Sequence, residues 1–465
     1  MKGRHILALT AALLVAGNLV SEALMSASGH SRKSSALISG SCTFAMLCLA
    51  SVCCLKKSGP NLVPLMAIAF FTGGLTIAAD DFFRLSAHGK CILEDGKRIT
   101  IKAVILDYGL TGKGKTFLLA ELPGEKTLVY GIPDSLEFTA GDTLNATVRV
   151  SAVKNFTENF DYRRHMQRKG IYHLCFIYST ADFRISPCRS AGLRFQPQRQ
   201  RQKFSAAVDS LLPGTERKET RAVVKALAYG YMDEIPESTI EAFRSSGAMH
   251  LLALSGMHLN LIHLILSRIL AIAGNSSRIR KIRSIAILLV LWFYTVFTGC
   301  GMSILRAMTM VTVYETGEFL GRRKNGIGAL SLSAVIIILC NPHAPSDIGF
   351  QLSCAAMLGI FLIHPQIISL FPFKRQLAVS FRNTCSVSVS CQLLTMPLVF
   401  IHFGTFSIFS LSINILCSPL ASTALILVPI SFISDSLGWS GFLSPADILE
   451  KTVLLFIYLN TIVPR

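Results

Sequence analysis

The chain has 465 residues, of which 51% are hydrophobic and only 15% are charged, and its formal net charge is +18. Because an average soluble domain has about 25% charged residues, this composition argues against a purely soluble enzyme, a disordered chain and a collagen-like chain. The positive charge fits either a nucleic-acid-binding protein or a membrane protein with basic loops. The 13 cysteines include no CxxC pair and no Cys/His cluster with metal-binding spacing, so no metal or cofactor is expected.

Apolar segments near the N-terminus predict a first group of membrane spans within residues 1–79. The segments 36–55 and 61–79 are uncharged and long enough to cross a bilayer as helices. Segment 6–20 is shorter, follows a basic N-terminus and precedes several small residues, so it is either a cleaved signal peptide or a first anchor. The two spans that follow it closely favour the anchor.

Residues 80–190 differ in character and predict a small β-barrel or β-sandwich. Alternating β-branched and apolar residues occur in four runs: 99–106, 116–122, 144–153 and 172–178. Turns rich in Gly, Pro and Asp separate these runs. About five short strands in a hundred residues are typical of these two architectures.

One stretch, from Gly109 to Thr116, matches the P-loop pattern. A P-loop requires a helix directly after it, because the N-terminus of that helix holds the phosphate. Here only six residues precede Pro123 and Gly124, which leaves no room for such a helix. We therefore interpret the stretch as a Gly/Lys-rich hairpin between two strands.

Residues 191–248 predict one or two amphipathic helices. Pro213 and Gly214 mark a break, because neither residue continues a helix well. Neither half contains 18 consecutive apolar residues, so the segment is expected on or beside the membrane rather than across it.

Residues 249–465 predict a hydrophobic bundle of transmembrane helices. Eight further spans are expected at 249–272, 284–300, 303–319, 326–340, 347–364, 383–403, 408–433 and 451–463. With the three N-terminal segments, the total is about eleven spans. The fold class is therefore a polytopic α-helical membrane protein with an inserted β-domain.

Lysine and arginine gather in every second loop of this arrangement. The basic groups on one side are Lys56 with Lys57, 278–283, 322–324 and 374–382. Because loops rich in lysine and arginine stay in the cytoplasm, this orientation places residues 80–248 outside it. Only Arg32 and Lys33 oppose the pattern.

Three of the spans begin with polar or ionisable residues at the end that faces outward in this orientation. They are His250, Ser255 and His258 in the first, Arg306 in the second, and Asp347 and Gln351 in the third. Such groups are costly inside a membrane and tend to line a pathway or pair with one another. We therefore predict a polar channel vestibule that opens toward the β-domain, with His250 and His258 about 80° apart on one continuous helix.

Two other interpretations of these residues stay open. Arg306 and Asp347 could form a structural ion pair between helices, with the histidines merely bonded to their neighbours. Ser255 and His258 could belong to an intramembrane hydrolase, but no acidic residue that would orient the base is identifiable. We expect the protein not to be an enzyme.

Several ordered stretches resemble a known family. They are FRSSGAMHLLALSGMH at 243–258, SILRA at 303–307, Gly321 and Arg322 with Pro342 beyond them, DIGFQLS at 347–353 and, upstream, NFDY at 159–162 followed by Gly170 and Ile171. Together they resemble the ComEC family, the inner-membrane DNA channels of natural transformation, over roughly residues 36–430.

This resemblance implies that residues 80–190 form an OB-like domain and that the protein passes single-stranded DNA across the bacterial inner (cytoplasmic) membrane. The implied partners are single-stranded DNA, membrane lipid, and the DNA-delivery and cytoplasmic translocation proteins of the competence machinery, and a homo-oligomer stays open. Members often continue into a metallo-β-lactamase-like domain. This chain ends at Arg465 without an HxHxDH cluster, so no nuclease activity is expected: either it is a short member, or a C-terminal part is missing or encoded separately.

An OB-like barrel binds single strands by base stacking and a basic groove. The candidate contacts, none assigned individually, are Phe117, Tyr130, Phe156, Phe160, Tyr162, Tyr172, Arg163, Arg164, Arg168 and Lys169. The alternative function is a permease or exporter of another anionic solute or lipid, and a third is a purely structural membrane protein.

Overall fold

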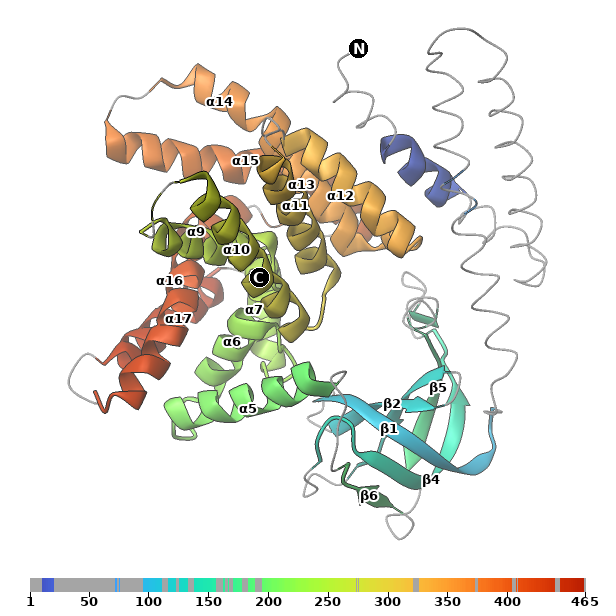
Figure 1. Cartoon of the computed structure of the whole chain (residues 1–465). Coiled ribbons are helices and arrows are strands. Elements are labelled where there is room, and N and C mark those ends of the chain that lie inside the picture. Colours follow the sequence, from blue (N-terminus) through green and yellow to red (C-terminus); the bar gives the residue numbers. More distant parts are fainter. Residues whose placement is uncertain are drawn as a thin grey trace, which may run out of the picture.

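The computed structural model joins a β-barrel to a bundle of helices (Figure 1). It describes residues 11–20, 72, 75, 95–110, 116–122, 125–132, 138–155, 162–163, 166, 170–177, 183–188, 195–272, 274, 276–320, 326–372, 375–403, 407, 409–439 and 444–463. The predicted spans 36–55 and 61–79 therefore lie outside the described residues, apart from residues 72 and 75.

Five strands form a closed barrel in the β-domain. They are β1 (Arg98–Leu110), β2 (Thr116–Leu122), β3 (Glu125–Tyr130), β4 (Thr143–Ala152) and β5 (Ile171–Ile177). Their order is β1-β2-β3-β5-β4, and β4 pairs with β1 again, so each of the five strands has two neighbours. The β3–β5 pair is parallel and the other pairs are antiparallel. A short strand β6 (Arg184–Ser186) pairs with the start of β4.

Strand β1 closes the barrel because it is long enough to pair on both sides. Residues 98–104 pair with β4, and residues 104–110 pair with β2. The register shifts between Ile105 and Asp107, close to the point where the partner changes. Such an irregularity bends a strand, and β1 can thereby belong to both edges of the curved sheet.

Four of the five barrel strands confirm the predicted runs, whereas β3 and β6 were missed. Strand β3 begins with Glu125 and Lys126, which hide its apolar alternation, and β6 has only three residues. Strands β1 and β2 flank residues 111–115, with Leu110 opposite Thr116. Because a strand follows Thr116, the hairpin interpretation is confirmed and the P-loop is excluded.

Three helices, rather than one or two, follow the barrel: α5 (Gln196–Leu211), α6 (Lys218–Tyr229) and α7 (Glu237–Ser245). The break at Pro213 and Gly214 is confirmed. The second break lies at Gly230, which takes the left-handed conformation (φ +82°) that favours glycine at a helix end. Helix α6 is almost wholly buried, in a core that it shares with the C-terminal helices. The location of residues 191–248 on or beside the membrane stays a prediction.

Each of the eight spans predicted in the C-terminal half falls on helical chain. The elements are α8 (Met249–Leu252), α9 (Gly256–Ala271), α10 (Ser277–Phe297), α11 (Met302–Phe319), α12 (Gly326–Cys340), the 3-10 turn η3 (Ala344–Ser346), α13 (Ile348–Leu362), α14 (His364–Leu370), α15 (Gln376–Phe403), α16 (Ser410–Ser436) and α17 (Pro445–Thr461).

Three stretches of the described helices are long and apolar enough to cross a membrane: Ile348–Leu370, Ala378–His402 and Ser410–Ser436. Shorter apolar helices are Ala11–Val20, Gly256–Ala271 and Gly326–Cys340. Helices of this length and composition make the chain a membrane protein. The total of about eleven spans stays a prediction.

The N-terminal helix Ala11–Val20 packs against the bundle. Leu14 lies in an apolar cluster with residues of α12 and α13, including Ile338 and Phe350. The buried side chain of Asn18 donates a hydrogen bond to the carbonyl of Pro342, at 2.8 Å. These contacts favour a retained anchor over a cleaved signal peptide, because cleavage would expose the apolar surface that Leu14 covers.

Helix α5 connects the barrel to the bundle (Figure 1). On the barrel side, Arg199 donates a hydrogen bond to the carbonyl of Ala140 at 2.8 Å, and Arg201 forms an ion pair with Asp107 of β1 at 3.0 Å. On the bundle side, the guanidinium of Arg201 lies against Gly299, in the turn between α10 and α11. The barrel is therefore held next to the turn that leads into Arg306.

Candidate functional site

The predicted span 249–272 is a broken helix rather than a continuous one. Helix α8 ends at Leu252, Ala253 has an extended backbone, and Ser255 is the N-cap of α9. The Ser255 hydroxyl accepts the N–H of Met257 at 3.3 Å, and Nδ1 of His258 accepts the N–H of Ser255 at 3.2 Å. This is a capping box in which an imidazole replaces the usual glutamate.

The break corrects the predicted geometry of the histidines. Helical spacing of about 100° per residue does not apply across non-helical residues, so the 80° angle between His250 and His258 has no basis. His250 is exposed on α8, whereas His258 is 1% exposed on α9. The two imidazoles still lie close enough to interact electrostatically.

His258 offers a buried hydrogen-bond donor. Because Nδ1 accepts from the backbone of Ser255, the ring proton belongs on Nε2. Nε2 is buried and has no hydrogen-bond partner among the described residues. Buried polar atoms are rarely unpaired in native proteins, so this N–H is a candidate to bind a group that enters the site.

Arg306 lies on α11 and is 2% exposed. Its guanidinium donates hydrogen bonds to the carbonyls of Ser303 and Gly349, each at 3.3 Å, and to the Ser303 hydroxyl at 3.5 Å. These long contacts use three of the five N–H donors of an arginine. The site thus holds a nearly buried cation with remaining capacity to bind an anion.

Asp347 is not the ion-pair partner of Arg306. Its carboxylate caps α13 by accepting the N–H of Phe350 at 3.0 Å. No ion pair of Arg306 with Asp347 within 4.0 Å occurs in the structure, although the two charges attract each other over a longer distance. The structural ion pair that was left open is therefore wrong as a direct contact.

Gln351 joins two further elements at this end of the bundle. Its amide nitrogen donates a hydrogen bond to the carbonyl of Pro345 at 2.8 Å, and its amide oxygen lies 3.0 Å from Nε2 of His402. His402 is exposed in the last turn of α15 and was not predicted. Its position at the end of an apolar segment could have predicted a polar residue at the membrane surface, because a histidine at the end of a span is often exposed to water.

The six predicted residues belong to one connected region of the bundle. A side chain added at Gly256, the first residue of α9, would lie 3.3 Å from Ala307, which puts the N-terminus of α9 next to Arg306. Arg306 in turn contacts the first turn of α13. The structure thereby brings together helix ends that the sequence places up to a hundred residues apart.

An aromatic row crosses the outer face of the barrel. The rings of Phe117 and Tyr130 lie 5.7 Å apart, and those of Tyr130 and Phe176 lie 5.4 Å apart and nearly parallel, at 20°. The three residues are cross-strand partners on β2, β3 and β5. Their chain neighbours Leu118 and Val129 are completely buried inside the barrel, so the row faces outward.

Phe176 is 42% exposed and was not among the predicted contacts. Phe117 and Tyr130 are half-buried, and Tyr162 packs beside them. Burial, and the nearby Tyr162, raise the pKa of the Tyr130 hydroxyl above its usual range, so this group stays neutral at physiological pH. Of the other candidates, Phe156, Phe160, Arg164, Arg168 and Lys169 lie outside the described residues.

A family model described as "Competence protein" matches residues 227–459, half of the chain. The chain belongs to the competence protein family. It is 30% identical over 261 residues to ComE operon protein 3 of Bacillus subtilis (strain 168), an alignment that covers 56% of this chain and 31% of that protein. All six predicted vestibule residues lie within the segment that the family model matches.

Two further relatives are more distant. Recombination protein 2 of Haemophilus influenzae is 24% identical over 167 residues, which cover 35% of this chain and 21% of that protein. An uncharacterized protein of Aquifex aeolicus is 26% identical over 207 residues, which cover 41% of this chain and 48% of that protein. The chain spans less than half the length of these curated relatives, and no solved structure matches it.

Within the family segment, the sequence missed a polar cluster next to α8. The Ser410 hydroxyl lies within hydrogen-bond distance of the Gly247 carbonyl (3.5 Å), the Gln392 amide (3.3 Å) and the Asn414 amide (3.4 Å). Because long segments without charged residues predict a span, these uncharged polar residues did not stand out. The spacing of Ser407, Ser410 and Asn414, three and four residues apart, could have predicted a polar face on one helix.

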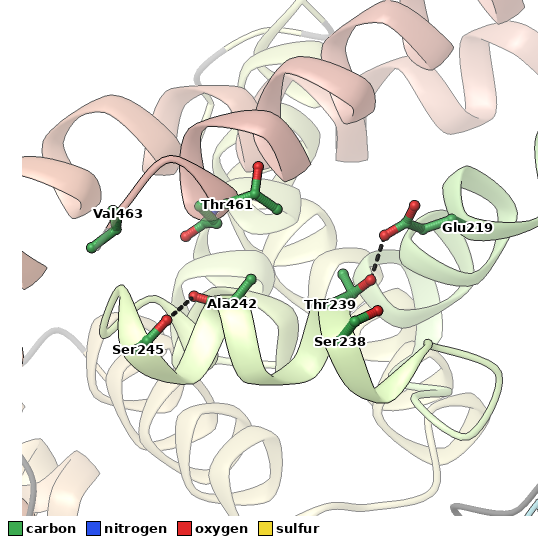
Figure 2. A pocket seen from close by; sticks show the side chains of 8 residues that line it. Glu219, Ser238, Thr239, Ala242, Ser245, Thr461 and Val463 are labelled. Atoms are coloured by element: carbon green, nitrogen blue, oxygen red, sulfur yellow. Dashed lines mark hydrogen bonds between the residues drawn. The ribbon is translucent and has the colours of Figure 1, made fainter. Parts of the chain in front are cut away.

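A polar pocket of about 150 Å³ lies elsewhere, between α6, α7 and α17, and contains none of the predicted residues (Figure 2). Glu219 accepts a hydrogen bond from Thr239 at one side of it. Its lining residues are Glu219, Ser238, Thr239, Ala242, Ser245, Asn460, Thr461 and Val463. In the part of the chain that the structure describes, no group of three or more His, Cys, Asp or Glu side chains is placed to hold a metal ion.

Proposed function

We propose that this protein is a channel through which single-stranded DNA crosses the bacterial inner membrane during natural transformation. The observation that carries the proposal is the buried Arg306, which donates to the carbonyls of Ser303 on α11 and Gly349 in the first turn of α13 and lies next to the N-terminus of α9. Membership of the competence protein family supports the same role. The relative in Bacillus subtilis is named after the ComE operon, and the one in Haemophilus influenzae after recombination.

The broken helix supplies donors for an anionic chain. A helix that begins inside a membrane directs backbone N–H groups and the positive end of its dipole toward the break. Ser255 marks that break, with the unpaired Nε2–H of His258 and the cation of Arg306 in the same region. A phosphate backbone could exchange its water for these donors, and their moderate number would let it leave again.

We propose that the barrel is an OB-like domain that receives the strand. The OB-fold is a five-stranded Greek-key barrel, and the closed order β1-β2-β3-β5-β4 with a parallel β3–β5 pair supports this assignment. Such barrels bind single strands without sequence preference by stacking bases on aromatic rings. Phe117, Tyr130 and Phe176 offer such rings in one row.

Phe176→Ala is expected to weaken binding of a single-stranded oligonucleotide to the full chain in lipid nanodiscs by about 1–3 kcal/mol, the usual loss for one stacked base. Fluorescence anisotropy measures this change. Trp439→Ala is the control, because Trp439 is 59% exposed at the end of α16, on the side predicted to be cytoplasmic. Equal affinities of Phe176→Ala and the parent protein would remove the stacking role.

The proposed orientation keeps residues 80–248 outside the cytoplasm. The direction rests on the basic loops. Three contacts support the alternation of the spans, because each joins span ends that this alternation puts on the same side of the membrane: Asn18 with Pro342, Gln351 with His402, and His364 with Ser386. The same orientation puts the vestibule residues on the side of the barrel.

A reporter enzyme that is active only outside the cytoplasm is expected to be active when fused after Gly141 and inactive when fused after Lys281. Gly141 lies in the barrel, and Lys281 lies in the basic first turns of α10, which the positive-inside rule keeps in the cytoplasm. Activity measured in intact cells decides the result. The reverse pair of activities would overturn the orientation and, with it, the outward vestibule.

Membrane lipid, DNA-delivery proteins and cytoplasmic translocation proteins remain the proposed partners, together with a second copy of the chain. A permease or exporter of another anionic solute or lipid is less favoured, because the family and the named relatives point to competence and recombination. We propose no enzymatic step for the described residues.

Uptake of DNA by a deletion strain tests the proposal as a whole. Cells that lack the chain are expected to bind external DNA at the parental level but to recover almost no transformants, and a plasmid copy should restore them. Labelled DNA should then stay outside the cytoplasm. Parental transformation frequency in the deletion strain would refute the channel.

A further inference from the structure

A second set of polar residues lies in the bundle, away from the vestibule. His263 of α9, Ser284 of α10 and Glu315 of α11 meet at one point. Nε2 of His263 lies 3.0 Å from one carboxylate oxygen of Glu315, and the Ser284 hydroxyl donates to the other oxygen at 2.5 Å. No sequence motif singled out these three residues, because they lie on three different helices and only the packing of those helices brings them together.

The carboxylate of Glu315 is nearly buried, with a side chain that is 7% exposed. The same three helices form an apolar core, which includes Leu259, Leu291 and Met308. A charge in such surroundings is costly and is kept only with a partner or a function. His263, whose side chain is 21% exposed, connects Glu315 to a more accessible position.

Among the described residues, the charged groups nearest to this pair in sequence are Arg280, Lys281 and Arg283 of α10, Arg268 of α9 and Glu318 of α11. Helices α12 and α13, which pack against α11, contain no lysine, arginine, aspartate or glutamate. Helix α10 supplies Arg283, directly before Ser284, and Lys281, whose ammonium lies 4.9 Å above the ring of Phe319. Helix α9 supplies Arg268, which is exposed.

We propose that His263 and Glu315 form a proton-binding site of the membrane bundle, with Ser284 as a positioning residue. With one shared proton the pair is neutral overall, as an ion pair or as imidazole and carboxylic acid. A second proton, taken from water, leaves the imidazolium and the carboxylic acid with charge +1. Its return to water restores the neutral pair, and no other reactant takes part.

This cycle changes the charge of a nearly buried site, so it changes the stability of the α9–α11 contact. The vestibule depends on the same two helices, because Gly256 and Ala307 form part of it. Proton binding would therefore alter the packing of the helices that carry His258 and Arg306. The inference goes beyond DNA passage and does not depend on it.

Infrared difference spectroscopy of the full chain in nanodiscs tests this proposal. Lowering the pH is expected to produce the carbonyl band of a protonated carboxylic acid that Glu315→Gln lacks, and His263→Gln should shift the pH at which the band appears. Glu241→Gln is the control, because Glu241 forms an exposed ion pair with Arg244 on α7. Identical pH-difference spectra of the parent protein and Glu315→Gln would overturn the proposal. The spectra are recorded without DNA, so failure of this proposal is distinct from failure of the channel.

Discussion

Arg306→Ala is expected to reduce DNA uptake to the level of the deletion strain, while the protein stays in the membrane at normal abundance. The substitution removes a nearly buried cation at the point where a phosphate backbone would meet the bundle, and no other lysine or arginine of α9 or α11 lies near this end. The lost contacts to Ser303 and Gly349 are long, so the fold should tolerate the change. Transformation frequency and the amount of protein in the membrane fraction are the two measurements.

Arg306→Lys separates charge from geometry. A lysine keeps the positive charge but lacks the planar fork that can hold a carbonyl and a phosphate at the same time. An intermediate transformation frequency is expected. Full uptake by Arg306→Ala would contradict any role of Arg306 in transport.

The double exchange Arg306→Asp with Asp347→Arg is expected to fail as well. An ion pair would survive this exchange with its sign reversed, but Asp347 acts as a helix cap and not as a direct partner. Asp347→Asn, which can still cap α13, should keep most of the uptake, whereas Asp347→Ala should lower stability by about 0.5–2 kcal/mol. Restored uptake in the exchanged protein would show that the pair is structural after all.

The combined change Asp209→Asn and Glu234→Gln is expected to cause the largest loss of stability, about 3–5 kcal/mol. Lys225 is 2% exposed on α6, and its ammonium binds Asp209 at 2.9 Å and Glu234 at 2.7 Å. Without these carboxylates a buried charge has no ionic partner. Thermal unfolding of the protein in detergent measures the loss.

Lys225→Met is the matched control for this network. It removes the buried charge and leaves an apolar side chain of similar length, while the side chains of Asp209 and Glu234 are 46% and 29% exposed and can be solvated by water. The loss should therefore be clearly smaller than in the double variant. Equal unfolding temperatures of the two variants would show that the loss of stability in the double variant does not come from the buried ammonium.

Much of this protein was determined by local sequence. Alternation of β-branched residues predicted β1, β2, β4 and β5, and long uncharged runs predicted the helices of the bundle, because each pattern reflects which face of a single element is buried. Proline and glycine at 213–214 predicted a helix break that the structure contains. Polar and ionisable residues at the ends of apolar segments predicted the vestibule residues, and that prediction needed only the sequence of each span.

The tertiary structure decided which residues meet. The apolar sequence pattern predicts one helix through Ala253 and Ser255. The helix breaks there, because the side chains of Ser255 and His258 cap a new helix. Closure of the barrel depends on β1 pairing with two distant strands, and the partners of Arg306 and Glu315 come from other helices. Sequence patterns report on neighbours within one element, whereas these contacts depend on how separate elements pack, so only the three-dimensional arrangement could show them.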